Sequence, residues 1–130
     1  MITKLTNLQA ETLLNTSTVS TISTAGVVAY TAAQILSGLI LRNTNGAGRA
    51  DTVPTVASLA AQLENPDAGT SFEFTIRNTA GAAETITVST ATGWTLSGTM
   101  TIAQSNSKRF KVVFTSPTAA TLYSLGTFVH

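Results

Sequence analysis

The second half of the chain alternates apolar and polar residues in short runs, and this period of two is the strongest constraint on the fold. In the run at 70–78, Phe72, Phe74 and Ile76 share one parity while polar side chains occupy the other. Turn residues separate this run from similar ones at 84–90, 93–98, 99–104, 108–115 and 120–129. Such alternation predicts half-buried antiparallel strands, at the spacing found in sandwiches and barrels. We expect seven or eight strands.

The composition agrees with a mainly β protein. Threonine, a β-branched residue suited to pleated surfaces, occurs 25 times, and only 10% of the 130 residues are charged. The formal net charge is +1 and the basic residues are scattered, so the sequence predicts no nucleic-acid partner. Because the chain has no cysteine, it can form neither disulfides nor thiolate metal sites.

One short helix is expected near residues 54–64. Pro54 suits a first helical turn, and Asp51 lies where the positive end of the helix dipole would be. An apolar stripe follows at helical spacing, and the Asn-Pro pair at 65–66 ends it. The stripe consists of Val56, Leu59, Ala60 and Leu63.

The segment 35–43 has strand length and is apolar on both alternating faces. We therefore expect both faces to be covered, one of them by a second chain. The candidates for the subunit or capsid contact here are Leu39, Ile40, Leu41 and Arg42, together with Asp51. A membrane helix over 25–41 is disfavoured because the run is short and contains polar residues and two glycines.

Residues 1–26 are expected to form an extended N-terminal arm, followed by one domain over 27–130. The arm carries Leu5, Leu8 and Leu13 and then a polar stretch of β character. Neither half of it resembles a self-sufficient element. The three leucines are therefore further candidates for contact with a neighbouring subunit or a capsid.

The glycine-rich stretch LILRNTNGAG at 39–48 raises the question of a phosphate-binding loop. No lysine follows its glycines, and the dinucleotide fingerprint is absent. A second strand ends in the same way, since Arg77-Asn78-Thr79 repeats Arg42-Asn43-Thr44. Two tight strand exits are the better interpretation, with Arg42 and Asp51 forming an ion pair that fixes the first turn.

No catalytic, metal or cofactor site is expected. The only histidine is His130, and the serines and threonines therefore lack a plausible base. Glu73 lies on an outward strand face, where Arg77, Arg109 or Lys111 could neutralise it. Trp94, Tyr30 and Tyr123 are candidates for a sugar-stacking platform, although Trp94 shares the parity of Leu96 and is expected to be buried.

With these motifs placed, the chain resembles small β-rich proteins of tailed bacteriophages, the capsid decoration or cement proteins. The likeness covers residues 30–126. It is carried by the pattern of Thr31-Ala32-Ala33, Arg42, Asp51, Pro54-Thr55 and the Arg77-Asn78-Thr79 turn.

The resemblance implies an antiparallel, jelly-roll-like β-sandwich that forms a homotrimer, binds the major capsid protein and stabilises the capsid. It also implies a location on the virion surface after assembly in the host cytoplasm, with no enzymatic activity, cofactor, small-molecule substrate or membrane. A carbohydrate- or receptor-binding head of a tail fibre or an adhesin is the alternative.

Overall fold

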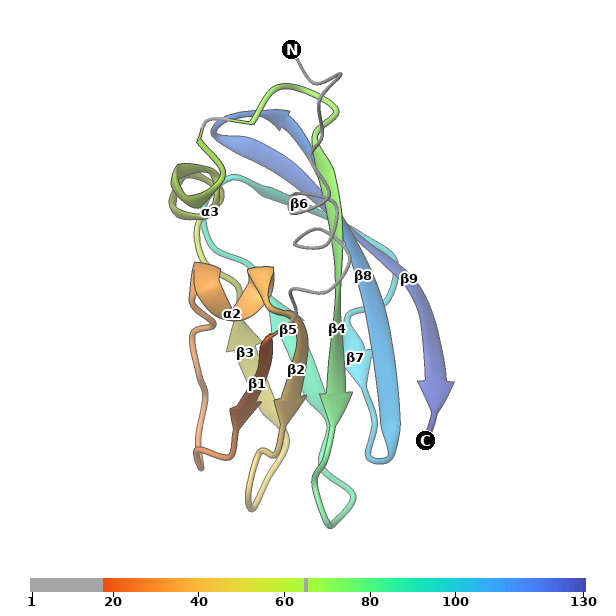
Figure 1. The fold of residues 1–130 in the computed structure, drawn as a ribbon. Coiled ribbons are helices and arrows are strands. Elements are labelled where there is room, and N and C mark those ends of the chain that lie inside the picture. Colours follow the sequence, from red (N-terminus) through yellow and green to blue (C-terminus); the bar gives the residue numbers. More distant parts are fainter. Residues whose placement is uncertain (1–17, 65) are drawn as a thin grey trace, which may run out of the picture.

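The computed structural model describes residues 18–64 and 66–130, and this part of the chain is mainly β, as the sequence predicts (Figure 1). It contains nine strands, compared with the seven or eight expected, and two short helices. The strands are β1 (Thr18–Ile22), β2 (Gly38–Arg42), β3 (Arg49–Thr52), β4 (Ser71–Asn78), β5 (Ile86–Ser89), β6 (Trp94–Ser97), β7 (Thr101–Ile102), β8 (Asn106–Ser116) and β9 (Ala119–Val129). The helices are α2 (Ala32–Leu36) and α3 (Val56–Gln62).

The strands form two mixed sheets, which corrects the expectation of a purely antiparallel fold. The larger sheet has the order β1-β2-β4-β8-β9-β6, and the smaller has the order β3-β5-β7. The pairs β1–β2, β2–β4, β3–β5 and β6–β9 are parallel. Alternation along one strand shows which face is buried but not the direction of the neighbouring strand. The sequence pattern therefore could not distinguish parallel from antiparallel pairing.

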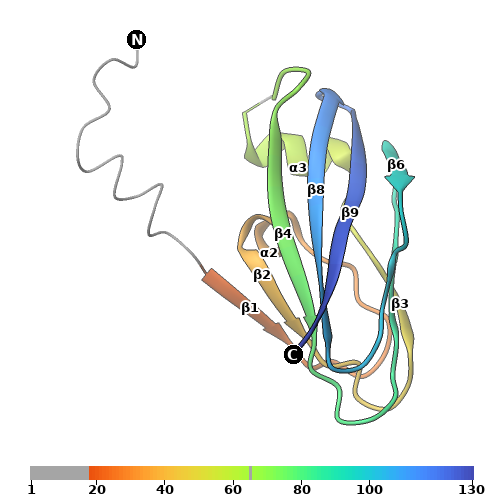
Figure 2. The ribbon, with the colours of Figure 1, turned by 90° about the vertical axis from the view of Figure 1, so that its right-hand side faces the viewer.

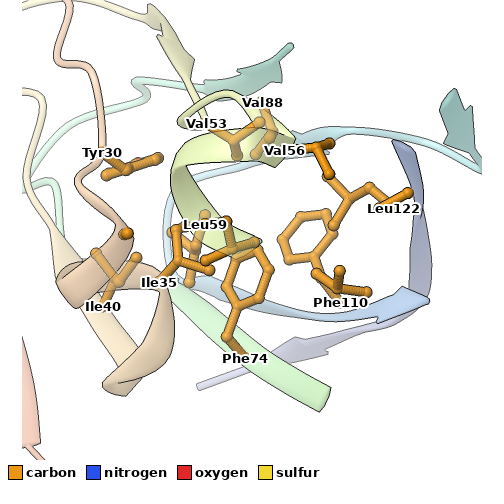
Figure 3. Packing of buried hydrophobic residues seen from close by; sticks show 14 of the residues in the cluster. Tyr30, Ile35, Ile40, Val53, Val56, Leu59, Phe74, Val88, Phe110 and Leu122 are labelled. Atoms are coloured by element: carbon orange, nitrogen blue, oxygen red, sulfur yellow. The ribbon is translucent and has the colours of Figure 1, made fainter. Parts of the chain in front are cut away.

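One hydrophobic core lies between the larger sheet and the other elements (Figure 3). The two helices and both sheets contribute to it, and Phe74 and Phe110 stack across β4 and β8 with ring centroids 5.2 Å apart. Tyr30, Ile40, Leu59, Val88 and Leu122 are also members. In Figure 2, β4, β8 and β9 lie in front of α3, so the helix covers only one face of this sheet.

The helix expected near 54–64 is confirmed as α3, although it starts at Val56. Its N-cap is Thr55, whose hydroxyl accepts a hydrogen bond from the Ser58 amide at 3.1 Å. Val56, Leu59 and Ala60 are buried, as their spacing predicts. Asp51 belongs instead to β3, so the prediction that it lies at the helix start is wrong.

The strand expected over 35–43 is shorter, because α2 occupies its beginning. Thr31 and Gln34 form a capping box in which each side chain accepts from the other residue's amide, at 3.1 and 2.9 Å. Gly38, at φ +88°, then changes the chain direction, and β2 runs from Gly38 to Arg42.

Part of the expected arm is a strand of the larger sheet. Residues 18–22 form β1, which pairs in parallel with β2 over its whole length. Residues 1–17, including Leu5, Leu8 and Leu13, lie outside the described residues.

Candidate functional site

The interface candidates of β2 fall on two different faces of the larger sheet. Ile40 and Arg42 point into the core with 0% exposure, and Asp51 of β3 is equally buried. Leu39 and Leu41 are half-buried and have the opposite parity. A second subunit approaching this sheet from outside meets Leu39 and Leu41, whereas Ile40, Arg42 and Asp51 are enclosed by their own chain. Of the interface candidates that the structure describes, only Leu39 and Leu41 are therefore placed where a second subunit could contact them.

Arg42 is the centre of a buried polar cluster. Its Nε donates to Asp51 Oδ2 at 2.7 Å, and Nη2 donates to Asp51 Oδ1 at 3.2 Å. The predicted ion pair is thus confirmed. The remaining donors reach backbone carbonyls, with Nη1 bonded to Thr24 and Asn43 at 2.8 and 2.7 Å and Nη2 to Gly26 at 2.6 Å. A buried guanidinium is tolerated here because its hydrogen bonds are satisfied.

Asp51 completes the cluster from the other side. Its Oδ1 accepts from the Val28 amide at 3.0 Å, and its Oδ2 accepts from the Tyr30 hydroxyl at 2.8 Å. Burial, together with the adjacent carboxylate, raises the pKa of Tyr30 above its ordinary value, so its hydroxyl remains a donor. The cluster fixes the segment between β1 and α2 to β2 and β3, and its role is structural.

The two Arg-Asn-Thr strand exits lie side by side but are displaced by one residue. In the parallel pair β2–β4, Arg42 is opposite Asn78 and Leu41 is opposite Arg77. Because neighbours in register share a face, Arg42 is buried whereas Arg77 is exposed. Identical tripeptides therefore have different roles.

Buried Asn78 closes the loop that follows β4. Its Nδ2 donates to the carbonyls of Glu84 and Ile102 at 2.7 and 3.0 Å, and its Oδ1 accepts from the Ala80 amide at 3.0 Å. The Glu84 carboxylate in turn accepts from the Thr44 hydroxyl at 2.5 Å and the Gly46 amide at 3.0 Å. The NTNGAG turn is thus bonded to the neighbouring loop, as expected of a structural corner.

The outward face of the larger sheet is the candidate interaction surface, and Figure 2 shows β4, β8 and β9 from this side. We call it the outer face. Rows of paired residues cross it, and three of these rows carry its charged and exposed apolar side chains, as the strand register shows. These three rows are Val19-Leu39-Thr75-Arg109-Gly126, Thr21-Leu41-Arg77-Ser107-Phe128 and Glu73-Lys111-Tyr123.

Apolar side chains remain accessible at both sides of the outer face. On β1, Val19 is 49% exposed, and on β9, Tyr123 and Phe128 are 40% and 50% exposed. Leu39 and Leu41 lie beside Val19 and are half-buried. Sequence reasoning identified the two leucines, included Val19 only as part of the arm at 1–26, and missed Phe128, although the parity of its strand was a usable signal.

The expected neutralisation of Glu73 is confirmed on this face. Arg109 Nε lies 3.7 Å from Glu73 Oε1, and both side chains are about half exposed. Such an exposed pair contributes little to stability.

The three aromatic candidates for a sugar platform do not form one surface. Tyr30 is 2% exposed and belongs to the buried cluster. Trp94 is half-buried, packs against the core and donates from Nε1 to the Pro54 carbonyl at 2.7 Å. Only Tyr123 is accessible to a ligand among these three.

Lys108 is a buried cation that sequence reasoning did not single out. It is 3% exposed, and its Nζ donates to the carbonyl and hydroxyl of Thr99 at 3.0 and 2.9 Å. Burial lowers its pKa.

Within residues 18–64 and 66–130, no three histidine, cysteine, aspartate or glutamate side chains gather as metal ligands. Over the same ranges, no helix is long and apolar enough to cross a membrane. Comparison of the chain with protein-family models, with curated proteins and with solved structures gave no match.

Proposed function

We propose that this chain is a structural protein of a bacteriophage virion, which decorates and stabilises the capsid by binding the lattice of the major capsid protein. It acts as a homotrimer, has no catalytic role and is built as a sandwich related to the jelly roll. The observation that carries this proposal is the outer face, where Val19, Tyr123 and Phe128 are exposed on a sheet face without a covering helix among the described residues. We interpret these exposed apolar side chains, with the half-buried Leu39 and Leu41 beside Val19, as two apolar flanks of an interaction surface.

The buried Arg42 cluster supports the same proposal. It uses two of the buried charged groups, Arg42 and Asp51, to hold the chain together, with their donors and acceptors satisfied by the protein itself. A polar cluster without a free reactive group suits a scaffold better than an enzyme.

The test uses empty shells assembled from the major capsid protein encoded in the same genome. We expect the purified protein to sediment with the shells in a saturable manner and to raise their melting temperature. Native mass spectrometry at micromolar concentration is expected to give three times the chain mass. A protein that stays in the supernatant at all concentrations would contradict the proposal, and a monomer would contradict the trimer.

A receptor- or carbohydrate-binding head is the second candidate, and exposed Tyr123 favours it. Aromatic side chains with an accessible face stack on sugar rings. A glycan array distinguishes the two, because saturable glycan binding lost in Tyr123→Ala would support the head and not the decoration protein.

A further inference from the structure

The middle of the outer face is positively charged. Arg77 on β4 and Arg109 and Lys111 on β8 share it with a single acid, Glu73, which leaves two uncompensated positive charges. Arg109 lies near Glu73, but neither Arg77 nor Lys111 forms an ion pair within the described part of the chain. The face therefore attracts negative charge.

Arg109 is already held in position. Its guanidinium lies 5.5 Å from the centre of the Phe128 ring, and its Nε lies 3.7 Å from Glu73. Gly126, opposite Arg109 on β9, has no side chain to lift the guanidinium off the sheet. The contacts with Phe128 and Glu73 restrict the cation, which reduces the entropy lost when a partner binds.

Apart from Glu73, the described acidic residues that are exposed or partly exposed lie outside the outer face. Glu64 and Asp67 flank the connection between α3 and β4, and Glu84 is bonded to Thr44 and Gly46. The formal net charge of the whole chain is only +1. The outer face is therefore positive because most acidic residues lie away from its basic ones, and not because the chain is basic.

We propose that the outer face docks onto an acidic protein surface. This inference rests on the proposed function, in which that surface belongs to the capsid lattice. Carboxylates of the partner bind Arg77, Arg109 and Lys111, since guanidinium groups form paired hydrogen bonds with carboxylates. Apolar side chains of the partner contact the flanks, Val19, Leu39 and Leu41 on one side and Tyr123 and Phe128 on the other.

The same face is poorly suited to nucleic acid. Polynucleotide binding depends on many neutralised phosphates, whereas this face has three cations interrupted by a carboxylate. Arginine residues at the centre with aromatic and aliphatic neighbours on the flanks are a composition typical of protein interfaces.

The experiment measures binding to the empty shells for a double variant, Arg77→Gln with Lys111→Gln. Its matched control, Ala82→Glu with Thr90→Glu, lowers the net charge by the same amount at exposed loop positions away from the outer face. We expect the double variant to bind at least about tenfold more weakly, as for lost charge-assisted contacts, and the control to bind as the wild-type protein does. Rising salt should weaken wild-type binding more than that of the variant.

Equal affinity of the double variant and the wild-type protein would overturn the docking inference while leaving the proposed function intact. Equal loss in the control would also overturn it, because net charge alone would then explain the effect. Tighter binding of single-stranded DNA than of shells would mean that the partner of the outer face is a polynucleotide and not an acidic protein. Absence of wild-type binding to the shells would overturn the proposed function and this inference together.

Discussion

At the scale of single residues, the fold depends on charged groups placed where apolar ones are expected. Arg42 has the parity of Ile40 and occupies the core side of β2, where five of its hydrogen bonds are made within the chain. The parity of Arg42 could be read from the sequence, and so could its pairing with Asp51. The carbonyls that receive its other donors could not, because they lie in a loop without a regular pattern.

Removing Arg42 should be far more damaging than removing an exposed arginine. Arg42→Met leaves buried Asp51 without a counter-ion, and loss of one partner of a buried pair costs about 3–5 kcal/mol. Arg109→Met, which breaks the exposed pair with Glu73, should cost less than about 1 kcal/mol. Urea unfolding of both variants measures the difference. Equal midpoints would show that the cluster contributes no more than a surface contact.

Lys108 should destabilise the fold when it is charged. Burial lowers its pKa in the folded state, so the unfolded chain binds more protons between that pKa and the ordinary value of 10.5, and the contribution of Lys108 improves as pH rises through this window. Lys108→Met should therefore unfold at higher urea concentration than the wild-type protein at pH 7. Thr99 is exposed, so its carbonyl can bond to water in the variant.

The advantage of Lys108→Met is expected to shrink between pH 7 and pH 9.5. A constant advantage over this range would mean that packing, not charge, is the cause. Lys111→Met removes a lysine that lies on the outer face, outside the core, and serves as the control for the substitution itself.

At the scale of elements, α2 is a helix that the sequence pattern did not predict. Its last two residues, Ile35 and Leu36, belong to the apolar run at 35–43 that indicates a strand, and only the capping pair Thr31 and Gln34 signalled a helix. The helix at 56–62 was predictable because its stripe continues for two turns. The parallel pairing of β1, β2 and β4 was not, since it joins segments far apart in the sequence.

The connection from β5 to β6 depends on a glycine. Gly93 has φ +100°, and a Cβ there would lie 2.5 Å from the Thr118 carbonyl oxygen and 2.9 Å from Val56 Cβ. Gly93→Ala should cost about 3 kcal/mol, from strain at positive φ and from overpacking. Gly81→Ala, where a methyl group meets nothing within 4 Å, is the matched control and should be near neutral. Thermal unfolding compares them, and equal melting temperatures would contradict the close contact.

At the scale of the whole molecule, stability should decrease from the middle of the larger sheet to its edges. β4 and β8 have a strand on each side and bury Phe74 and Phe110, whereas β1 and β6 each have a single neighbour in the described sheet. Amide hydrogen exchange should be slowest in β4 and β8 and fastest in β1 and β6. Uniform protection of all six strands would contradict this gradient and indicate that the sheet opens only as one unit.

The order of the larger sheet also has a consequence for biosynthesis. Among the described strands, β6 pairs only with β9, whose partner residues Ala120 to Tyr123 follow 26 positions later in the chain and which lies between β8 and β6. At roughly 5–20 residues per second, Trp94 and its neighbours leave the ribosome on the order of seconds before the strand that receives them. During that interval the segment has no strand to pair with, so its backbone amides and carbonyls stay hydrogen-bonded to water.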